Sequence, residues 1–221
     1  MSIIILNYIT WQSTLNCIQE LLKINYKYFN IIVVDNNSQN NSLKNIKEKL
    51  ELKSSIVNEN EISNLFLKNQ NEKIFFIQCL HNHGYAKGNN IGIRFAELFN
   101  PEFILILNND TLPKVDFLDN MVQTFNYNSK IGLVGAINYN DKNKYDLDSA
   151  KRNISWYHVL TIHQSFSFFN KLFKLYLFKN DSQISNLKKK EFIYVEIISG
   201  ACMLFKTDVL KKIDYFDENT F

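Results

Sequence analysis

The sequence has 221 residues, of which 46% are hydrophobic, 21% charged and 14% aromatic, so it is long enough to bury a sizeable core. Only six glycines and two prolines occur, which excludes collagen-like and low-complexity proteins. The net charge of +3 is too small to indicate nucleic-acid binding, and we expect no nucleic-acid partner.

Short apolar runs alternate with amphipathic segments along most of the chain. In chain order we predict a strand at 2–6, a helix at 11–23, a strand at 31–34, a helix at 42–52, a strand at 73–78, a helix at 85–99, a strand at 103–107, a helix at 116–127 and a strand at 131–137. Thr10 is expected to cap the first helix, and the Asn- and Glu-rich stretch 53–72 indicates exposed surface. This alternation predicts a single α/β domain with a mainly parallel sheet flanked by helices.

Polar residues follow four of these predicted strands. They are Asn7, Asp35-Asn36, His81-Asn82-His83-Gly84 and Asn108-Asn109-Asp110. The carboxyl ends of parallel strands share one edge of a sheet, where α/β proteins bind ligands, so we expect a binding site there. Turn preference explains any single asparagine in a chain with 31 of them, but it explains Asp35 and Asp110 less well.

Three of the six glycines, Gly84, Gly88 and Gly92, recur every fourth residue along one predicted helix. This spacing matches neither G-x-G-x-x-G nor a Walker loop, which disfavours dinucleotide-binding Rossmann proteins and P-loop proteins. A helix N-terminus with Lys87 nearby suits a diphosphate group. The alternative is close packing of the helix on the sheet, which is equally supported for Gly92 and less supported for Gly84 and Gly88.

Asp110 follows the buried run 103–107, where a carboxylate is costly unless it is paired, solvated or bound to a cation. One or two carboxylates, waters and substrate phosphate oxygens form the usual Mg²⁺ or Mn²⁺ site, so we consider a divalent-metal cofactor at Asp110. The four histidines form no H-E-x-x-H motif, and no Ser-His-Asp or Cys-His order is evident, which disfavours hydrolases and zinc proteases.

Three widely separated cysteines, Cys17, Cys79 and Cys202, form no C-x-x-C pair. We expect them to be reduced thiols in a cytoplasmic protein. We expect no secretory leader, and the sequence has no apolar run long enough to span a membrane.

The stretch 151–190 carries eight basic residues and one acidic residue. Within it, aromatic and leucine residues at 168–176 recur at helical spacing between lysines, which is typical of helices that lie on anionic membranes. We therefore consider peripheral membrane contact through 154–190. The favoured alternative is a helix that packs on the sheet with its lysines in water.

Six ordered motifs resemble one protein family. They are Ile4-Ile5-Leu6-Asn7-Tyr8, Val33-Val34-Asp35-Asn36-Asn37-Ser38, Asn82-His83-Gly84-Tyr85-Ala86, Gly88-Asn89-Asn90-Ile91-Gly92, Leu107-Asn108-Asn109-Asp110 and Ser199-Gly200-Ala201-Cys202-Met203. In this order they look like the family 2 glycosyltransferases, especially their rhamnosyltransferase-like branch. The resemblance begins at residue 2, continues to the last residue and is weakest in 53–72 and 140–190. It implies the GT-A fold, whose sheet is related to that of Rossmann proteins.

The resemblance also implies a nucleotide-diphosphate-sugar donor, with Asp35 reading the base and Asn7 beside it. The donor-binding residues carried over from the family motifs are Asn7, Asp35, Asn36, Asn82, Gly84, Tyr85, Lys87, Asn89, Asn90, Asn108 and Asn109. Asp110 matches the last acid, a metal ligand, of the family's D-x-D motif, in which Asn108 replaces the first acid. The acceptor side is implied at Gly200, Ala201, Asp217 and Glu218.

The implied activity is transfer of a sugar, of the hexosyl type and with inversion, to a polysaccharide or lipid-linked saccharide. Such a protein would serve polysaccharide biosynthesis of the cell envelope, in the cytoplasm or at the inner face of the membrane. Residues 1–139 would form the nucleotide-sugar-binding half and 140–221 the acceptor-side half. The family's Glu-Asp pair, which supplies the general base, would follow Phe221, so the second half looks truncated and we assign no catalytic residue.

Two alternatives to this activity stay open. A non-catalytic nucleotide-sugar-binding module, or a truncated remnant that lacks the general base, would share all the binding motifs. A nucleotidyltransferase would share the sheet and the metal. It needs a Gly- and Lys/Arg-rich phosphate loop after the first strand, however, and residues 7–11 do not form one.

Overall fold

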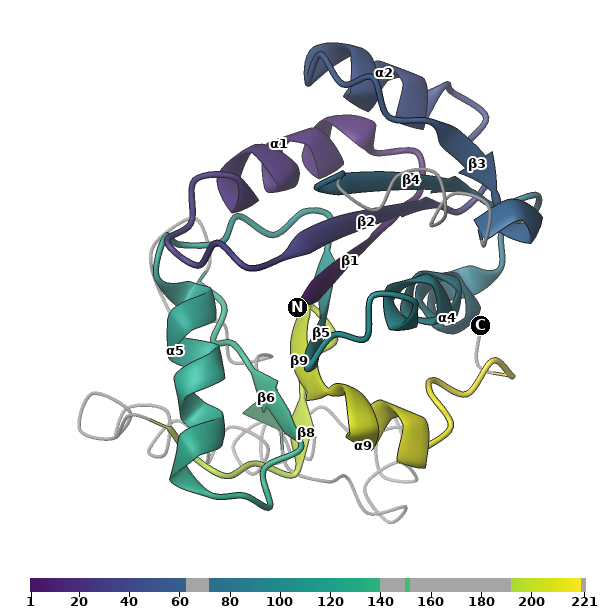
Figure 1. The fold of residues 1–221 in the computed structure, drawn as a ribbon. Coiled ribbons are helices and arrows are strands. Elements are labelled where there is room, and N and C mark those ends of the chain that lie inside the picture. The colour runs from purple at the N-terminus through teal and green to yellow at the C-terminus, as the bar shows by residue number, and fades with distance from the viewer. Residues whose placement is uncertain (63–71, 140–149, 152–191, 220–221) are drawn as a thin grey trace, which may run out of the picture. The chain divides into compact units, whose positions relative to one another are not determined.

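The computed structural model describes residues 1–62, 72–139, 150–151 and 192–219. Seven strands of these residues form one sheet, in the order β3-β4-β2-β1-β5-β9-β6 (Figure 1). The strands are β1 (Ser2–Asn7), β2 (Asn30–Asp35), β3 (Ile56–Asn58), β4 (Ile74–Gln78), β5 (Phe103–Asn108), β6 (Leu133–Gly135) and β9 (Cys202–Lys206). Neighbours from β3 to β5 pair in parallel, and β9 runs antiparallel to β5. The mainly parallel α/β sheet predicted from the sequence is confirmed.

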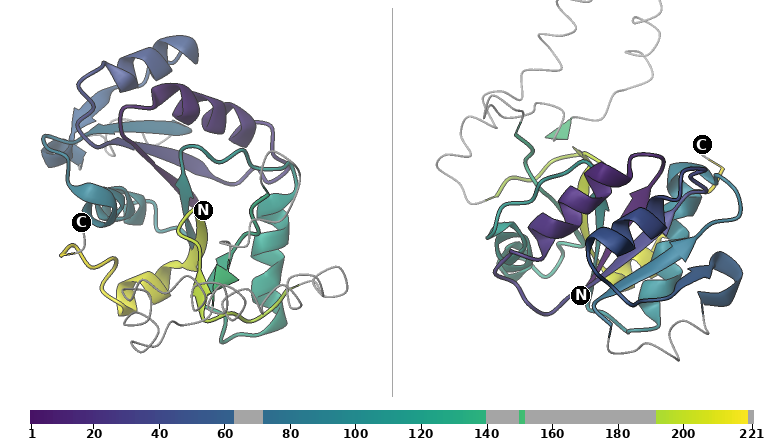
Figure 2. Two further views of the ribbon diagram at one scale, coloured as in Figure 1. Left: turned by 180° about the vertical axis from the view of Figure 1, so that it is seen from behind. Right: turned by 90° about the horizontal axis from the view of Figure 1, so that it is seen from above.

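Helices cover both faces of this sheet. They are α1 (Trp11–Leu21), α2 (Ser42–Lys49), α4 (Gly84–Glu97), α5 (Phe117–Thr124) and α9 (Thr207–Lys212), with 3₁₀ turns η1 (Glu59–Glu61) and η2 (Phe125–Tyr127). Figures 1 and 2 show α1 and α4 on opposite sides of β1 and β2. Within the described residues, no helix has the length and apolar character needed to cross a membrane.

The chain divides into two compact units. The first contains residues 1–134 and 200–221, and the second contains 135–199. Segment 200–221 joins the first unit because β9 pairs with β5, so it packs with the half that the sequence assigns to donor binding. In the described part of the second unit, two short antiparallel strands pair: β7 (Ala150–Lys151) and β8 (Ile197–Ile198). The predicted helix at 168–176 lies outside the described residues.

Uninterrupted β-branched runs are buried on both faces of the central strands. Residues 3–5 of β1 and 31–34 of β2 are fully buried. A strand covered by helices on both sides has no face in water, which explains why these runs are apolar without alternation. Burying each such side chain stabilises the fold by about 1.5–3 kcal/mol. These central strands are therefore held firmly, and their ends carry Asn7 and Asp35.

Close packing of α4 on β1 depends on Gly88 and Gly92. A Cβ atom at Gly88 would lie 2.6 Å from Cδ1 of Leu6, and one at Gly92 would lie 2.6 Å from Cγ2 of Ile4. Real Cβ atoms do not approach other atoms so closely, so both glycines allow the helix to contact the strand. The packing alternative therefore accounts for Gly88 as well as Gly92.

Several local details differ from the sequence prediction. The stretch 53–72 contains strand β3, which has only three residues at a sheet edge and therefore a weak apolar signal. Thr10 lies at the N-cap position of α1 but makes no capping hydrogen bond, and its hydroxyl accepts one from Asn109 instead. The strand predicted at 131–137 is reduced to the three residues of β6, beside β9.

Candidate functional site

Four adjacent strands end at one edge of the sheet. The parallel register pairs Asn7 with Asp35, Asp35 with Gln78, and Leu6 with Asn108. The ends of β4, β2, β1 and β5 therefore lie side by side. The sequence predicts this convergence from strand order, and the structure confirms it.

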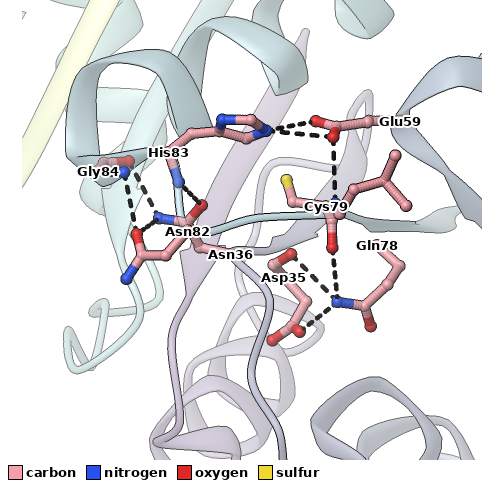
Figure 3. A network of polar contacts seen from close by, with 9 residues as sticks. Asp35, Asn36, Glu59, Gln78, Cys79, Asn82, His83 and Gly84 are labelled. Atoms are coloured by element: carbon pink, nitrogen blue, oxygen red, sulfur yellow. Dashed lines mark hydrogen bonds and ion pairs between the residues drawn. The ribbon is translucent and has the colours of Figure 1, made fainter.

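Asp35, at the end of β2, has a fully buried carboxylate. Its Oδ1 accepts a hydrogen bond from Nδ2 of Asn7. Its Oδ2 accepts hydrogen bonds from Nε2 of Gln78 at 2.7 Å and from the backbone N of Ser38 at 2.9 Å, the first of which Figure 3 shows. All three donors are neutral amides, so hydrogen bonds rather than a paired cation compensate the burial of this charge. The carboxylate thereby ties the turn after β2 to the ends of β1 and β4.

Asn7 extends this buried network toward α1. Its Oδ1 accepts a hydrogen bond from Oγ1 of Thr14 at 2.6 Å, and its Nδ2 also contacts Oγ of Ser38 at 3.3 Å. Both Asn7 and Asp35 are 0% exposed, so a nucleobase could reach Asp35 only by replacing one of its protein donors. The base-reading role that the family resemblance implies for Asp35 stays a prediction.

Asn36 connects the end of β2 to the start of α4. Its Nδ2 donates to Oδ1 of Asn82 at 2.7 Å and to the carbonyl of Gly84 at 3.1 Å (Figure 3). Its Oδ1 accepts from the backbone N of His83 at 2.8 Å, and Oδ1 of Asn82 accepts from the backbone N of Gly84 at 2.9 Å. The first residues of a helix have N–H groups without helical partners, and these bonds satisfy two of them and fix the helix start.

Gly84 begins α4 with a φ of 73°, in the left-handed region that favours glycine. The N-terminus of this 14-residue helix carries a partial positive charge, and Lys87 adds a full charge in the first turn. The start of α4 is therefore chemically suited to bind phosphate oxygens.

The end of β5 is more open than the end of β2. Asn108 and Asn109 are half-buried, whereas Asp110 is exposed. Nδ2 of Asn109 donates to the hydroxyls of Thr10 at 2.8 Å and Thr14 at 3.0 Å, which joins this strand end to α1. Asp110 is thus a carboxylate that solvent and ligands can reach, on a strand that ends at the same edge as Asp35.

The donor chemistry at Asp110 fits a hard divalent cation. Mg²⁺ and Mn²⁺ prefer oxygen ligands and usually combine one or two carboxylates with waters and substrate phosphates. Asp110 supplies one exposed carboxylate, and the amide oxygen of half-buried Asn108 is a further hard ligand of the same strand end. The carboxylate of Asp35 is fully buried and already accepts three hydrogen bonds from the protein, so Asp110 is the more accessible ligand.

Tyr85 and Asn108 join the predicted donor side to the segment that precedes β9. The hydroxyl of Tyr85 donates to the carbonyl of Gly200 at 2.9 Å, and the backbone N of Asn108 donates to the carbonyl of Ala201 at 2.9 Å. Partial burial, followed by the nearby thiol of Cys202, raises the pKa of Tyr85 to about 12, so this hydroxyl keeps its proton at neutral pH. Residues implied for the acceptor side thus contact residues implied for the donor side.

Asn90 binds the segment at Phe216 through both backbone groups of that residue. Its Nδ2 donates to the carbonyl of Phe216 at 2.9 Å, and its Oδ1 accepts from the backbone N at 3.1 Å. Oε1 of Glu218 accepts from Nδ2 of Asn90 at 3.0 Å and from Nη2 of Arg94 at 2.9 Å. The bond from Asn90, with a smaller contribution from Arg94, lowers the pKa of Glu218, so this carboxylate is ionised at neutral pH. The donor-binding role implied for Asn90 stays a prediction.

The predicted donor and metal residues fall into two sets. Those buried among protein partners are Asn7, Asp35, Asn36, Asn89 and Asn90. Those exposed or half-buried are Asn82, Gly84, Tyr85, Lys87, Asn108, Asn109 and Asp110. The predicted acceptor-side residues Asp217 and Glu218 are exposed, and hydrogen bonds from Asn219 lower the pKa of Asp217.

Sequence reasoning missed Gln78, which donates to Asp35, and the group around Glu59. Nε2 of His83 lies 2.8 Å from Oε2 of Glu59, and the thiol of Cys79 is close to both (Figure 3). The pattern Cys79-x-His81-x-His83 is a sequence signal for this group, but nothing local in the sequence points to Glu59.

The sequence model of glycosyl transferase family 2 matches residues 2–214. The chain belongs to glycosyltransferase family 2. The family resemblance carried by the six motifs is therefore confirmed, while the rhamnosyltransferase-like branch stays a prediction. A comparison of this family 2 chain with curated proteins finds no match.

Solved glycosyltransferase structures resemble this family 2 chain in fold. One is the mannosyltransferase PcManGT from Pyrobaculum calidifontis in complex with GDP-Man and Mn²⁺, with a TM-score of 0.58 and 13% identity over 99% of this chain and 47% of that chain. S. aureus TarS 1–349 in complex with UDP gives a TM-score of 0.57 and 14% identity over 99% and 50%. The same protein with UDP-GlcNAc gives 0.55 and 15% over 98% and 48%. These likenesses show the GT-A fold, and the chain spans about half the length of each structure.

Proposed function

We propose that this family 2 protein transfers a sugar from a nucleotide-diphosphate-sugar to a polysaccharide or lipid-linked acceptor, with inversion at the anomeric carbon. The observation that carries the proposal is the convergence of polar strand ends, at Asn7, Asp35 and Asn108, on one sheet edge in a family 2 chain. The complexes of similar folds with GDP-Man, UDP and UDP-GlcNAc support a nucleotide-sugar donor.

The two sets of site residues have different tasks in this proposal. The buried set holds the backbone around the site in place. Asp35 fixes the turn after β2, and Asn36 orients the start of α4. The accessible set contacts the donor, with the N-terminus of α4 and Lys87 holding the diphosphate. The hydrogen bonds made by Asn7, Asp35 and Asn36 keep the contact groups in one geometry, which favours binding by reducing the entropy lost on association.

Asp110 holds Mg²⁺ or Mn²⁺ in this proposal. The chain supplies the carboxylate oxygen of Asp110, and the substrate phosphates supply further hard oxygens. A cation bound there stabilises negative charge on the nucleotide diphosphate as it leaves. The Mn²⁺ in the PcManGT complex supports a divalent cation in this fold.

We propose no general base among the described residues. The acceptor hydroxyl needs a base to become a good nucleophile in an inverting displacement. Glu218 is held by Asn90 and Arg94, and Asp217 accepts hydrogen bonds from Asn219, so each carboxylate already has a structural task. With Gly200, they are proposed to shape the acceptor side.

The type of sugar, the biosynthetic role and the membrane contact are also proposals. The motif resemblance supports a hexosyltransferase of the rhamnosyltransferase-like branch, in cell-envelope polysaccharide biosynthesis. The basic, aromatic stretch 154–190 supports peripheral contact with an anionic membrane at its cytoplasmic face. Co-sedimentation with vesicles of anionic lipid tests this contact, and vesicles of neutral lipid are the control.

The central proposal is tested by calorimetric titration of the chain with UDP, GDP and dTDP, each with Mn²⁺ and with a chelator. We expect one nucleotide to bind more tightly than the others, and Mn²⁺ to increase its affinity. A folded chain that binds none of the three overturns the proposal. Binding without sugar transfer to any acceptor or hydrolysis of the matching nucleotide-sugar favours the alternative, a non-catalytic nucleotide-sugar-binding module.

A further inference from the structure

A second group of metal-ligating side chains lies beside the start of α4. Glu59 comes from η1, Cys79 follows β4, and His83 immediately precedes α4 (Figure 3). One ligand atom of each residue lies within 4.8 Å of the other two. In the described residues, this is the one group of three such ligands. Two parts of the first unit, η1 and the loop between β4 and α4, thus bring a carboxylate, a thiol and an imidazole together.

The surroundings of this group are largely closed to water. Cys79 is 1% exposed, and the side chains of His83 and Glu59 are 15% and 13% exposed. The carboxylate of Glu59 is oriented by the backbone N of Leu80, which donates to its Oε1 at 3.1 Å. Such an outer hydrogen bond fixes the direction of a ligand, as in many metal sites.

The spacing requires only a small adjustment to hold a metal ion. Tetrahedral coordination, with bonds of about 2.0–2.3 Å, separates neighbouring ligand atoms by about 3.3–3.8 Å. The contact of 2.8 Å between Nε2 of His83 and Oε2 of Glu59 must therefore open by about 0.5–1 Å. The ligand atoms of all three residues already lie within 4.8 Å of one another.

We propose that Glu59, Cys79 and His83 form a binding site for Zn²⁺ or a similar borderline-soft divalent cation. Thiolate and imidazole ligands favour Zn²⁺ over Mg²⁺ and Mn²⁺, which prefer oxygen. This site is therefore chemically distinct from Asp110 and does not depend on the proposed transferase function. A water molecule would complete the coordination.

Metal binding at this site displaces a proton. Cysteine binds such ions as the thiolate, so its proton must leave when the ion binds. Binding forms the metal–sulfur bond as the S–H bond breaks, and the proton passes to solvent. The bound ion would connect η1 to the loop that carries Asn82 and Gly84, and so stabilise the start of α4.

The test uses Co²⁺, a spectroscopic probe for zinc sites, with the full chain in a non-thiol reductant. We expect one equivalent to bind, with visible bands of tetrahedral cobalt and a near-ultraviolet thiolate-to-cobalt band that Zn²⁺ abolishes by competition. Cys79→Ser should remove the thiolate band, whereas Cys17→Ser and Cys202→Ser, at the other two buried cysteines, should retain it. Glu59→Gln and His83→Gln should each weaken binding by more than about tenfold.

Two results overturn the proposal. One is a wild-type chain that neither gives these bands nor shows a higher melting temperature with Zn²⁺. The other is a Cys79→Ser variant that binds Co²⁺ with the wild-type spectrum. Circular dichroism checks that each variant is folded, and Glu59→Gln keeps an oxygen that can accept from Leu80. Nucleotide titration in chelator reports on the transferase proposal separately, so failure of one proposal leaves the other intact.

Discussion

The ends of β2 and β5 contain the same residue types and treat them in opposite ways. Asp35 is fully buried, and its carboxylate accepts hydrogen bonds from three amide donors of the protein. Asp110 is exposed beyond the end of β5. One sheet edge therefore contains two kinds of polar residue. We call the buried, hydrogen-bonded residues Asn7, Asp35 and Asn36 the frame, and the accessible residues at the end of β5, Asn108 to Asp110, the rim. Burial decides to which of the two a carboxylate belongs.

Replacement of Asp35 should have the largest effect on stability. Asp35→Ala leaves the amides of Asn7 and Gln78 and the N–H of Ser38 without their acceptor in a buried place, which costs about 1–3 kcal/mol per group. We expect the free energy of unfolding to fall by about 3–5 kcal/mol in urea denaturation. Asp110→Ala should change it by less than about 0.5 kcal/mol. Similar losses in the two variants would contradict the contrast between frame and rim.

Asn36→Ala tests the frame at the start of α4. The variant loses hydrogen bonds to Asn82, His83 and Gly84, and we expect a loss of about 2 kcal/mol in the free energy of unfolding. Amide exchange at Gly84 should accelerate at the same time. Gln39→Ala, at an exposed neighbouring position, is the matched control. Unchanged exchange at Gly84 would show that Asn36 does not hold the helix start.

Asp110→Asn tests the rim. It keeps the shape of the side chain but removes the charge that a hard cation needs, so nucleotide affinity in Mn²⁺ should fall about tenfold, or about 1.4 kcal/mol. In chelator the variant and the wild type should bind equally, as measured by calorimetry. Asp119→Asn, an exposed carboxylate on α5, is the control. An unchanged effect of Mn²⁺ would remove Asp110 from the metal site.

The smallest effect is expected where the end of the chain meets α4. The pKa of Glu218 is lowered, so its contact with Asn90 and Arg94 stabilises the fold above the ordinary range of glutamate and loses this effect as the pH falls through the lowered pKa. Thermal unfolding of wild type and Glu218→Gln should therefore differ at about pH 7, by under about 1 kcal/mol, and converge as the pH falls below the lowered pKa of Glu218. Glu48→Gln, at an exposed residue of α2, controls for the substitution itself. A difference that persists at low pH would contradict this assignment.

The sequence predicts most strands and helices and their parallel arrangement, because the apolar patterns that indicate them are local. Buried β-branched runs such as 3–5 and 31–34 identify strands that are covered on both faces, and the alternation with helices implies their parallel order. The convergence of Asn7, Asp35 and Asn108 follows from that order. The short edge strand β3 is missed because three residues with exposed neighbours carry little periodicity.

The sequence could not predict which polar residues of the site are buried and hydrogen-bonded and which are accessible to a ligand. Asp35 and Asp110 both follow an apolar run, and only the tertiary structure shows that Gln78 and Ser38 satisfy one of them. The contact of Glu59 with His83 joins residues 24 positions apart, and that of Asn90 with Phe216 joins residues 126 apart. Such pairs depend on how strands and loops are assembled, which no local pattern encodes.

The second unit is an insertion between two strands of the same sheet, because the chain leaves the first unit after Val134 and returns at Gly200 to form β9. The entropy of closing a loop rises only with the logarithm of its length, by about 0.6 kcal/mol for each doubling. Shortening, lengthening or exchanging this insert therefore costs the sheet little. The architecture therefore allows residues 135–199 to change in length while the pairing of β9 with β5 keeps the strand edge of the candidate site in place.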